Sequence, residues 1–150
     1  MEKVLINKSI DINASKEKVW DVLTKDDMTR SWYKAFNTGA YAETDWKQGS
    51  KVIFKDGTEN GMIGKIVASI PGKIISTEFE GMLVNGVEDY DSQDAKNIKG
   101  YKETYHISGD GNQTTLSIEQ ETSDEYGDMM QTMWDKALLL IKQLAESQNR

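Results

Sequence analysis

The sequence predicts an α+β protein in which an antiparallel sheet packs against a long C-terminal helix. Apolar and polar residues alternate over residues 3–12, and again between about residues 41 and 122, as they do in half-buried strands. Residues 15–33 contain two short segments with helical spacing, and the chain ends in an apolar stripe of 3.6-residue period. Seven strands with the helices on one face satisfy this pattern, because each apolar stripe needs a second layer to cover it.

One strand and two short helices are expected at the start of the chain. The alternation over residues 3–12 places four aliphatic side chains and the charged Lys8 on one face of the first strand. Ser15 is a suitable N-cap for the first short helix, which has one apolar side. A second short helix is expected around residues 27–33, where two large apolar residues stand four positions apart.

Six further strands and their turns follow. The expected strands are residues 41–46, 51–55, 61–70, 73–80, 100–108 and 114–122. Pro71-Gly72 predicts a tight turn, and residues 109–112 predict a hairpin loop, because glycine and asparagine tolerate positive φ. Gly61 and Gly64 lie inside a strand pattern, where glycine marks a bulge or a close approach of two backbones.

Residues 81–99 are predicted to form a long acidic loop. Connections of this length are uncommon and often functional. The segment begins an Asp-x-Asp pattern at Asp89 that is similar to a calcium-binding loop. Asp94 and Gly100, however, stand where such a loop needs glycine and glutamate, so an EF-hand is excluded and a solvated acidic loop is expected.

The C-terminal helix has the clearest pattern in the chain. Thr122 and Glu125 have the spacing of a capping box, which predicts the start of the helix. An apolar stripe then continues for four turns. It consists of Met130, Met133, Trp134, Ala137, Leu138, Ile141, Leu144 and Ala145.

Composition bounds the class of protein. The 150 residues carry a net charge of −7, which disfavours nucleic acids and anionic membranes as partners. The absence of cysteine excludes disulfides, thiolate metal sites and cysteine nucleophiles. No apolar run is long enough for membrane insertion, and residues 1–4 do not begin a signal peptide. We expect residues 1–150 to form a single cytoplasmic domain.

Motifs for catalysis, metal binding and cofactor binding are missing from the sequence. The chain has no nucleophile elbow, no zinc-protease motif and no glycine-rich nucleotide loop. Its one histidine, His106, alternates with Tyr105 in a predicted strand and is expected on the outer surface of the sheet. We therefore expect neither a metal nor a cofactor, and binding is favoured over turnover.

The order of elements resembles the START/Bet v 1-like helix-grip superfamily, and within it the proteins related to the activator of heat-shock protein 90 ATPase. The resemblance spans nearly the whole chain and is carried by residues 12–20, 44–49, 61–64 and 100–105 and by the helix that contains Trp134. It implies a curved seven-stranded sheet that grips the C-terminal helix around a cavity. The similarity is to the C-terminal domain of the activator, and we expect no counterpart of its N-terminal domain in these residues. Fold alone implies little about chemistry.

The alternation assigns a set of side chains to the inner face of the sheet and to the helix that covers it. The candidate ligand-binding residues are Lys8, Trp32, Phe54, Met62, Thr77, Phe79, Tyr101, Glu103, Tyr105, Gln120, Met130, Met133 and Trp134. In a helix-grip sheet the first strand neighbours the last, so Lys8, Gln120 and Glu103 are predicted to form a polar row across the floor. These groups are either a structural ion pair or the polar contacts that orient a mostly apolar ligand.

Two further ambiguities remain at the level of sequence. The methionines and Trp134 of the last helix fit an ordinary helix–sheet core as well as the wall of a pocket. Trp32, Tyr33 and Phe36 follow the short helices, where such folds have their mouth, so they form either a gate or an apolar patch for a partner.

Three functions of different classes follow. The leading hypothesis is a protein that binds a small hydrophobic or amphipathic molecule in the cavity. The second is a chaperone-associated interaction module, for which residues 81–99 offer an acidic docking surface. The third is an enzyme of the cyclase or hydrolase type, with Glu103 and Tyr101 or Tyr105 as acid–base groups. The missing nucleophile and the outward histidine disfavour the enzyme.

Overall fold

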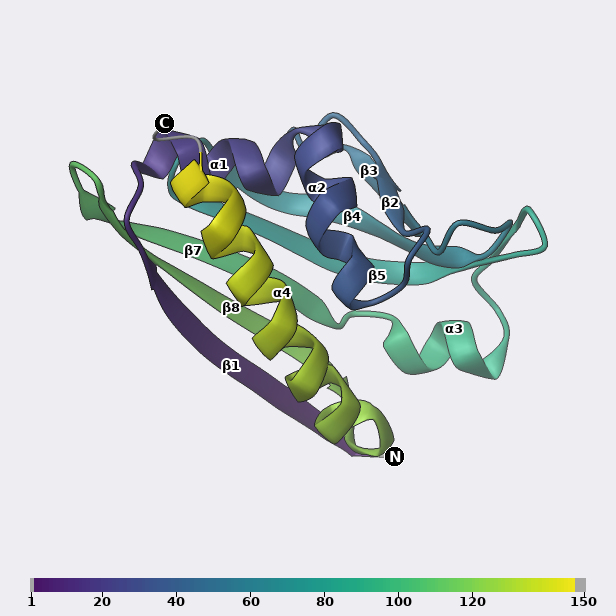
Figure 1. Ribbon diagram of the computed structural model, residues 1–150. Helices are drawn as coiled ribbons and strands as arrows, with labels where there is room; N and C mark the ends of the chain where they lie inside the picture. Colours follow the sequence, from purple (N-terminus) through teal and green to yellow (C-terminus); the bar gives the residue numbers. More distant parts are fainter. Residues whose placement is uncertain (1, 148–150) are drawn as a thin grey trace.

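A curved antiparallel sheet wraps around one long helix in the computed structural model (Figure 1). The structure describes residues 2–147, so the extreme ends of the expected 1–150 domain lie outside the described residues. The strands are β1 (Lys3–Ile12), β2 (Tyr41–Glu43), β3 (Lys51–Lys55), β4 (Gly61–Ile70), β5 (Ile74–Val84), β6 (Val87–Asp89), β7 (Lys102–Asp110) and β8 (Gln113–Ser123). The helices are α1 (Lys16–Thr24), α2 (Asp26–Trp32), α3 (Gln93–Ile98) and α4 (Gly127–Ser147), with short 3₁₀ turns η1 (Tyr33–Ala35) and η2 (Asp124–Tyr126).

The strand order of the sheet is β1-β8-β7-β5-β4-β3-β2, and β6 pairs with the end of β5. This arrangement confirms the predicted α+β helix-grip fold. The seven predicted strands are all present, although the strand expected at 41–46 ends at Glu43. The eighth strand, β6, was not predicted.

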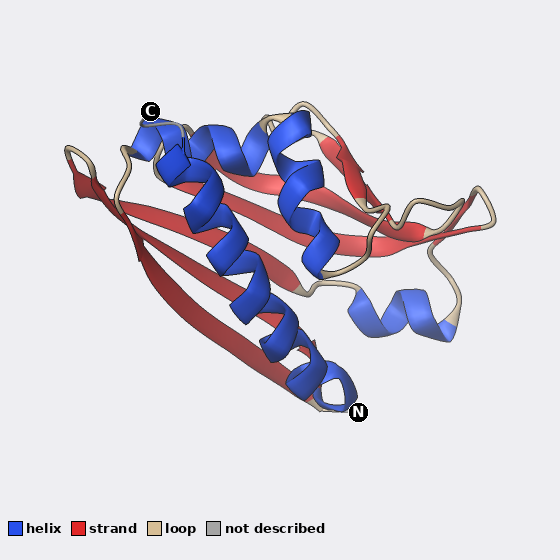
Figure 2. Cartoon of the chain, in the orientation of Figure 1, coloured by secondary structure: helices blue, strands red, loops and turns tan. Residues whose placement is uncertain are grey.

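The helices α1, α2 and α4 cover one face of the sheet (Figure 2). The side chain of Ser15 caps α1 as predicted, because its Oγ accepts a hydrogen bond from the backbone nitrogen of Lys18 at 3.3 Å. The apolar side of α1 is buried against the sheet and α4. Within residues 2–147, every helix is too short or too polar to cross a membrane.

Bulges in β4 bend the sheet around α4. The register between β4 and β5 shifts at Ile63/Gly64 and again at Ile66/Ala68. A Cβ atom at Gly64 would lie 2.8 Å from Cγ2 of Thr77 and 3.0 Å from the carbonyl oxygen of Glu78, so the two strands need glycine at this position. The expectation of a bulge or close approach at Gly64 is confirmed.

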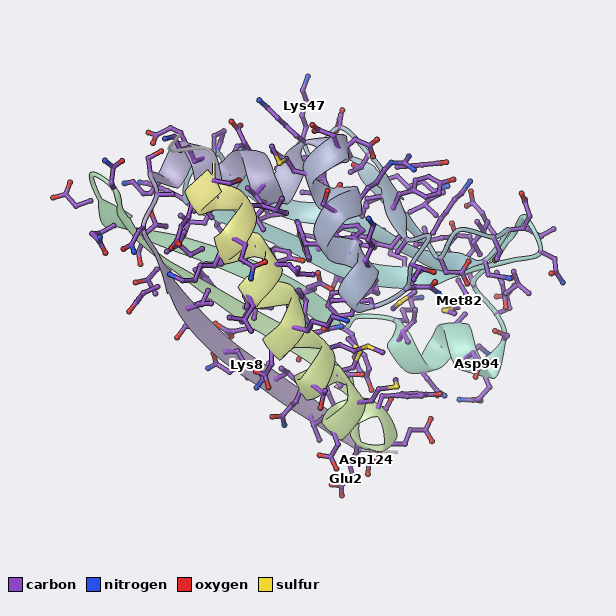
Figure 3. All side chains as sticks on the ribbon, in the orientation of Figure 1. Glu2, Lys8, Lys47, Met82, Asp94 and Asp124 are labelled. Carbon is purple, nitrogen blue, oxygen red and sulfur yellow. The ribbon has the colours of Figure 1, made fainter. Side chains whose placement is uncertain are left out.

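The acidic loop predicted for residues 81–99 is wrong. β5 continues to Val84, turns at Asn85-Gly86 and pairs with β6, and α3 follows (Figure 3). Asp89 Oδ1 accepts hydrogen bonds from the backbone nitrogens of Asp91 and Ser92, and Ser92 caps α3. Asp89 and Ser92 therefore form the turn that precedes α3. The helix itself could not be predicted, because it is short and mostly polar and its sequence has no clear helical period.

The capping box predicted at Thr122 and Glu125 is also wrong. Thr122 and Ser123 remain in β8, where they pair with Val4 and Lys3 of β1. The η2 turn then reverses the chain, and α4 begins at Gly127. Thr122 cannot cap a helix while its backbone belongs to the sheet.

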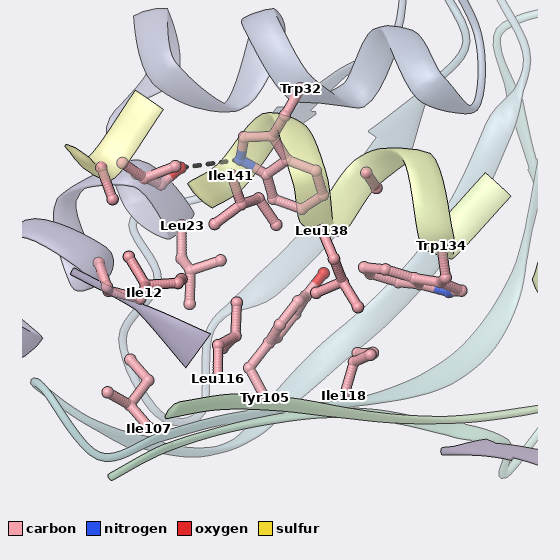
Figure 4. Packing of buried hydrophobic residues seen from close by; sticks show 14 of the residues in the cluster. Ile12, Leu23, Trp32, Tyr105, Ile107, Leu116, Ile118, Trp134, Leu138 and Ile141 are labelled. Atoms are coloured by element: carbon pink, nitrogen blue, oxygen red, sulfur yellow. Dashed lines mark hydrogen bonds between the residues drawn. The ribbon is translucent and has the colours of Figure 1, made fainter. Parts of the chain in front are cut away.

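Aromatic rings join α2, α4 and β7 in the centre of the core (Figure 4). The ring centroids of Trp32 and Trp134 lie 6.2 Å apart, and Tyr105 lies 5.9 Å from Trp134 and 6.4 Å from Trp32. The indole nitrogen of Trp32 donates a hydrogen bond of 2.9 Å to the carbonyl oxygen of Val22 in α1. The buried aromatic cluster fixes α2 and α4 over the sheet, and a pocket begins directly beside it.

Candidate functional site

A pocket of about 290 Å³ lies between the sheet, the first half of α4 and the η1 turn. Strands β3, β4, β5, β7 and β8 supply its floor, and α4 supplies the wall above them. Its lining is predominantly apolar. Pockets of this kind hold apolar molecules and orient them by a small number of polar groups.

Aromatic side chains form much of the wall. Phe54 lies 6.0 Å from Phe79 and 6.3 Å from Tyr33, measured between ring centroids. Phe36 contacts Trp134 edge-on with centroids 4.9 Å apart. These contacts hold the wall rigid, whereas the methionines of α4 can adapt to the shape of a ligand.

Two polar side chains stand side by side on the floor of this pocket. Glu103 of β7 and Gln120 of β8 are direct partners across the two strands. The Tyr105 hydroxyl donates a hydrogen bond of 2.6 Å to Glu103 Oε1, and the indole nitrogen of Trp134 donates to Gln120 Oε1. The core therefore orients both groups by one hydrogen bond each.

Burial raises the pKa of Glu103 to about 7, although the hydrogen bond from Tyr105 lowers it. As a whole residue Glu103 is only partly buried, and it lines the pocket. Burial, followed by the nearby charge of Glu103, also raises the pKa of the Tyr33 and Tyr105 hydroxyls well above the ordinary value. Near neutral pH, Glu103 is thus present both as an acceptor and as a protonated donor.

One polar atom of each floor group has no hydrogen-bond partner in the protein. Among residues 2–147, no hydrogen bond reaches the Gln120 amide nitrogen or the second carboxylate oxygen of Glu103, and every buried side-chain nitrogen or oxygen has a partner, so these two atoms are accessible rather than sealed in the core. Gln120 is only 7% exposed, and it lines the pocket. A free amide donor in such a place matches a hydrogen-bond acceptor on a bound molecule.

The mouth of the pocket carries the charged residue Lys55. Its ammonium group lies 3.0 Å from Glu43 Oε1 and 5.9 Å from the ring centroid of Tyr41. Arg30 stacks on the same ring at 4.3 Å. These contacts neutralise the rim and leave the interior to apolar groups.

The structure brings nine of the thirteen predicted residues together around this pocket. They are Phe54, Met62, Phe79, Glu103, Tyr105, Gln120, Met130, Met133 and Trp134. The other four lie elsewhere. Lys8 is at the edge of the sheet, Trp32 and Thr77 are in the closed core, and Tyr101 lines a neighbouring pocket.

The predicted polar row across the floor is wrong at Lys8. Gln120 pairs with Ile6, whereas Lys8 pairs with Ile118, one alternation further along β1. Lys8 Nζ instead reaches Asp135 of α4 at 2.7 Å. An edge strand lets a long side chain keep its stem on the apolar face while its ammonium group leaves the core.

Trp32 was expected in a gate or in an apolar patch for a partner, and it is in neither, because it is 1% exposed and its indole nitrogen donates a hydrogen bond to the carbonyl oxygen of Val22. Thr77 is buried where β4 and β5 approach at Gly64, so its side chain packs between strands. The Tyr101 hydroxyl lies 3.5 Å from Ser123 Oγ, beyond the end of the first pocket.

Five lining residues were absent from the predicted set: Tyr33, Phe36, Ala40, Tyr41 and Lys55. The sequence did single out Tyr33 and Phe36 as residues near the mouth. Ala40 lies in the connection to β2, whose path has no periodic signal, and Tyr41 is the first residue of β2. Lys55 is the last residue of β3 and pairs directly with Tyr41 of β2, so the two side chains lie next to each other.

His106 lies on the outer face as predicted, 3.4 Å from Glu119 Oε1. Within residues 2–147, no three histidine, aspartate or glutamate side chains are placed to hold a metal ion. The pocket lining also has no serine, threonine or histidine. Glu103 can exchange a proton with a ligand, but these walls offer no activated nucleophile beside it.

Comparisons with known proteins agree with this architecture. A family model described as Activator of Hsp90 ATPase homolog 1-like protein matches residues 13–146. The comparison with curated proteins finds no match.

Three solved structures show the same fold. The Aha1 dimer from Colwellia psychrerythraea is 25% identical, with a TM-score of 0.71 over 95% of this chain and 96% of that one. Protein MLL2253 from Mesorhizobium loti is 16% identical, with a TM-score of 0.70 over 97% and 98% of the two chains. ChR145 from Cytophaga hutchinsonii is 18% identical, with a TM-score of 0.69 over 99% of each chain.

Proposed function

The chain belongs to the Activator of Hsp90 ATPase homolog 1-like family, as its sequence resemblance predicted, and we propose that it binds a small, mostly apolar molecule in the pocket beneath α4. The fold is compatible with many activities, so the proposal rests on the site. It concerns binding and includes no chemical step.

The observation that carries the proposal is the free amide of Gln120 in an otherwise apolar pocket. A core that only stabilises the fold is close-packed, and its buried polar atoms are paired. Here about 290 Å³ remains unfilled, and the Gln120 amide nitrogen, which no protein group bonds, is open to accessible space rather than sealed in the core. A ligand with an apolar body and one acceptor group satisfies both features.

A neutral fluorescent probe tests the binding. N-phenyl-1-naphthylamine is apolar and fluoresces strongly when it leaves water, so a titration measures its Kd directly. We expect saturable binding with a stoichiometry of one. Met133→Trp places a bulky ring in the pocket from α4, and we expect it to weaken binding by roughly tenfold or more.

Leu139→Trp is the matched control. Leu139 is on the same helix but 55% exposed, and it does not line the pocket. It should bind the probe like the unmodified protein. Equal binding by both variants, or no saturable binding by the unmodified protein, contradicts the proposal.

The family description supports a second candidate, contact with a chaperone. It rests on the family match and on the likeness to the Aha1 dimer over nearly the whole of both chains. This role requires a cytoplasmic location. Purified Hsp90 should then be retained by the immobilised chain and show a changed ATPase rate. No retention together with an unchanged rate contradicts this candidate and leaves the ligand proposal intact.

A further inference from the structure

A second pocket, of about 320 Å³, lies beside the first on the same side of the sheet. It is formed by α3, the η2 turn, the first turn of α4 and the ends of β5 and β8. Met82 and Asp94 mark its α3 side in Figure 3, where methionine sulfur atoms lie between α3 and α4. Nothing in the proposed function uses this space.

Three side chains line both pockets and stand between them: Met62, Gln120 and Met130. The two methionines are partly exposed, and unbranched thioether side chains change rotamer at low cost. Gln120 is oriented by the hydrogen bond from the indole of Trp134, and it lines both pockets. A molecule longer than the first pocket can therefore extend past Gln120 when the methionines move aside.

The outer part of the second pocket is acidic and aromatic. Asp94 of α3 and Glu125 of η2 are exposed side chains that line it from two separate elements. A hydrogen bond to Glu125, together with the charges of Glu125 and Asp94, raises the pKa of the Tyr126 hydroxyl. Both carboxylates and the Tyr126 ring line the same pocket. Tyr101 adds a second aromatic ring.

Positive charge does not balance these carboxylates inside the pocket. Its lining, within residues 2–147, includes no lysine or arginine, and Lys96 of α3 and Lys99, directly after α3, are exposed and do not line it. Carboxylates with tyrosine rings favour organic ammonium groups, which gain both charge attraction and cation–π contacts. Gln120 lines both pockets, and its amide nitrogen has no protein partner and is not buried, so a ligand can accept a hydrogen bond from it at the junction.

We infer that the two pockets form one binding site for an elongated amphipathic cation, with the apolar body under α4, a hydrogen-bond acceptor at Gln120 and the ammonium group between Asp94 and Glu125. The inference rests on the proposed function and adds the ligand class to it. The first pocket selects for apolar bulk, and the second selects for positive charge.

Decanoylcholine and N-decanoylglycine test the inference, since they share an apolar chain and a carbonyl acceptor but carry opposite charges. Calorimetry below their micelle concentrations, at low salt, gives both Kd values. We expect decanoylcholine to bind at least tenfold more tightly. Asp94→Asn with Glu125→Gln should weaken decanoylcholine roughly fivefold and should not weaken N-decanoylglycine.

The control removes the same two charges elsewhere. Asp110→Asn with Glu17→Gln changes exposed residues that line neither pocket, and it should leave the preference for the cation unchanged. Equal affinity for the two probes, or an equal loss in both double variants, overturns the inference. If N-phenyl-1-naphthylamine still binds in those cases, the proposed function stands and only the cation inference fails. If neither N-phenyl-1-naphthylamine nor decanoylcholine binds, the proposed function and the cation inference both fail.

Discussion

Glu103→Gln should make the protein more stable at alkaline pH, although the change removes a charged group. The carboxyl group is surrounded by the sheet and α4, and its one hydrogen bond comes from Tyr105. The amide oxygen of glutamine can accept the same bond without carrying a charge. Folding then no longer has to bury an ionised group.

The size of the effect follows from the two pKa values of Glu103. The ordinary value of 4.5 applies to the unfolded chain, and burial raises the folded-state pKa to about 7. At 1.36 kcal/mol per pKa unit this interval corresponds to about 3 kcal/mol. Water in the pocket solvates part of the carboxylate, so we expect a gain of about 2 to 3 kcal/mol for the variant.

The sign of the pH dependence is fixed by the raised value. The folded protein holds the proton more tightly than the unfolded chain, so the favourable contribution of Glu103 is complete below pH 4.5 and is lost as pH rises through about 7. The free energy of unfolding of Glu103→Gln relative to the unmodified protein should therefore rise over this range and level off above it. Urea denaturation near pH 5 and near pH 8.5 measures the difference.

Glu80→Gln is the control for this experiment, because Glu80 is an exposed residue of β5 that lines neither pocket. Its effect should stay small and should not follow the pH profile expected for Glu103. A Glu103→Gln variant that is less stable at alkaline pH, or whose effect does not change with pH, refutes the argument that burial raises the pKa.

Three other changes probe the same site. Tyr105→Phe removes the hydrogen bond that lowers the pKa of Glu103, so this pKa should rise above about 7 in a carboxyl ¹³C NMR titration, and an unchanged value contradicts the role of the bond. Trp134→Phe leaves Gln120 Oε1 without its donor and should cost about 3 kcal/mol in urea denaturation, whereas a cost below about 1 kcal/mol would show that the contact is weak. Lys8→Met should leave N-phenyl-1-naphthylamine affinity unchanged, because Lys8 pairs with Asp135 outside the pocket; weakened binding would return it to the site.

The sheet and its inner face could be predicted because both depend on a two-residue period. Alternation in β7 and β8 placed Glu103, Tyr105 and Gln120 on one face, and the structure has them there. The 3.6-residue period of α4 likewise placed Met133 and Trp134 toward the sheet. A local sequence pattern is enough to predict which way a side chain points when the residue lies inside a regular strand or helix.

The parts that could not be predicted depend on the position of an element relative to distant ones. The alternation of β1 places Lys8 on the inner face of the sheet. Only the edge position of β1 and the nearby Asp135 show that its ammonium group leaves the core. Trp32 was expected near the mouth, in a gate or an apolar patch, but it is the last residue of α2 and is buried beside Trp134 of α4. Ala40 lines the pocket from the irregular connection before β2, and Tyr41 lines it from the first position of β2.

The second pocket could not be predicted either, because it also depends on elements that are distant in the sequence. Its α3 wall comes from a segment expected to be a loop, since a helix of six polar and small residues has no apolar stripe. Tyr101 was assigned to the correct face of the sheet. It lines the second pocket, whereas Glu103 lines the first, and this difference depends on the positions of η2 and α3.

The central claim is that the pocket holds a small molecule, and native mass spectrometry of gently purified protein tests it most directly. The account predicts a reproducible extra mass that disappears on denaturation, is absent from Met133→Trp and is retained in Leu139→Trp. The released compound should be largely apolar. A clean polypeptide mass, with no adduct after incubation with N-phenyl-1-naphthylamine or decanoylcholine, would contradict the claim and leave the space beneath α4 as an imperfectly packed core.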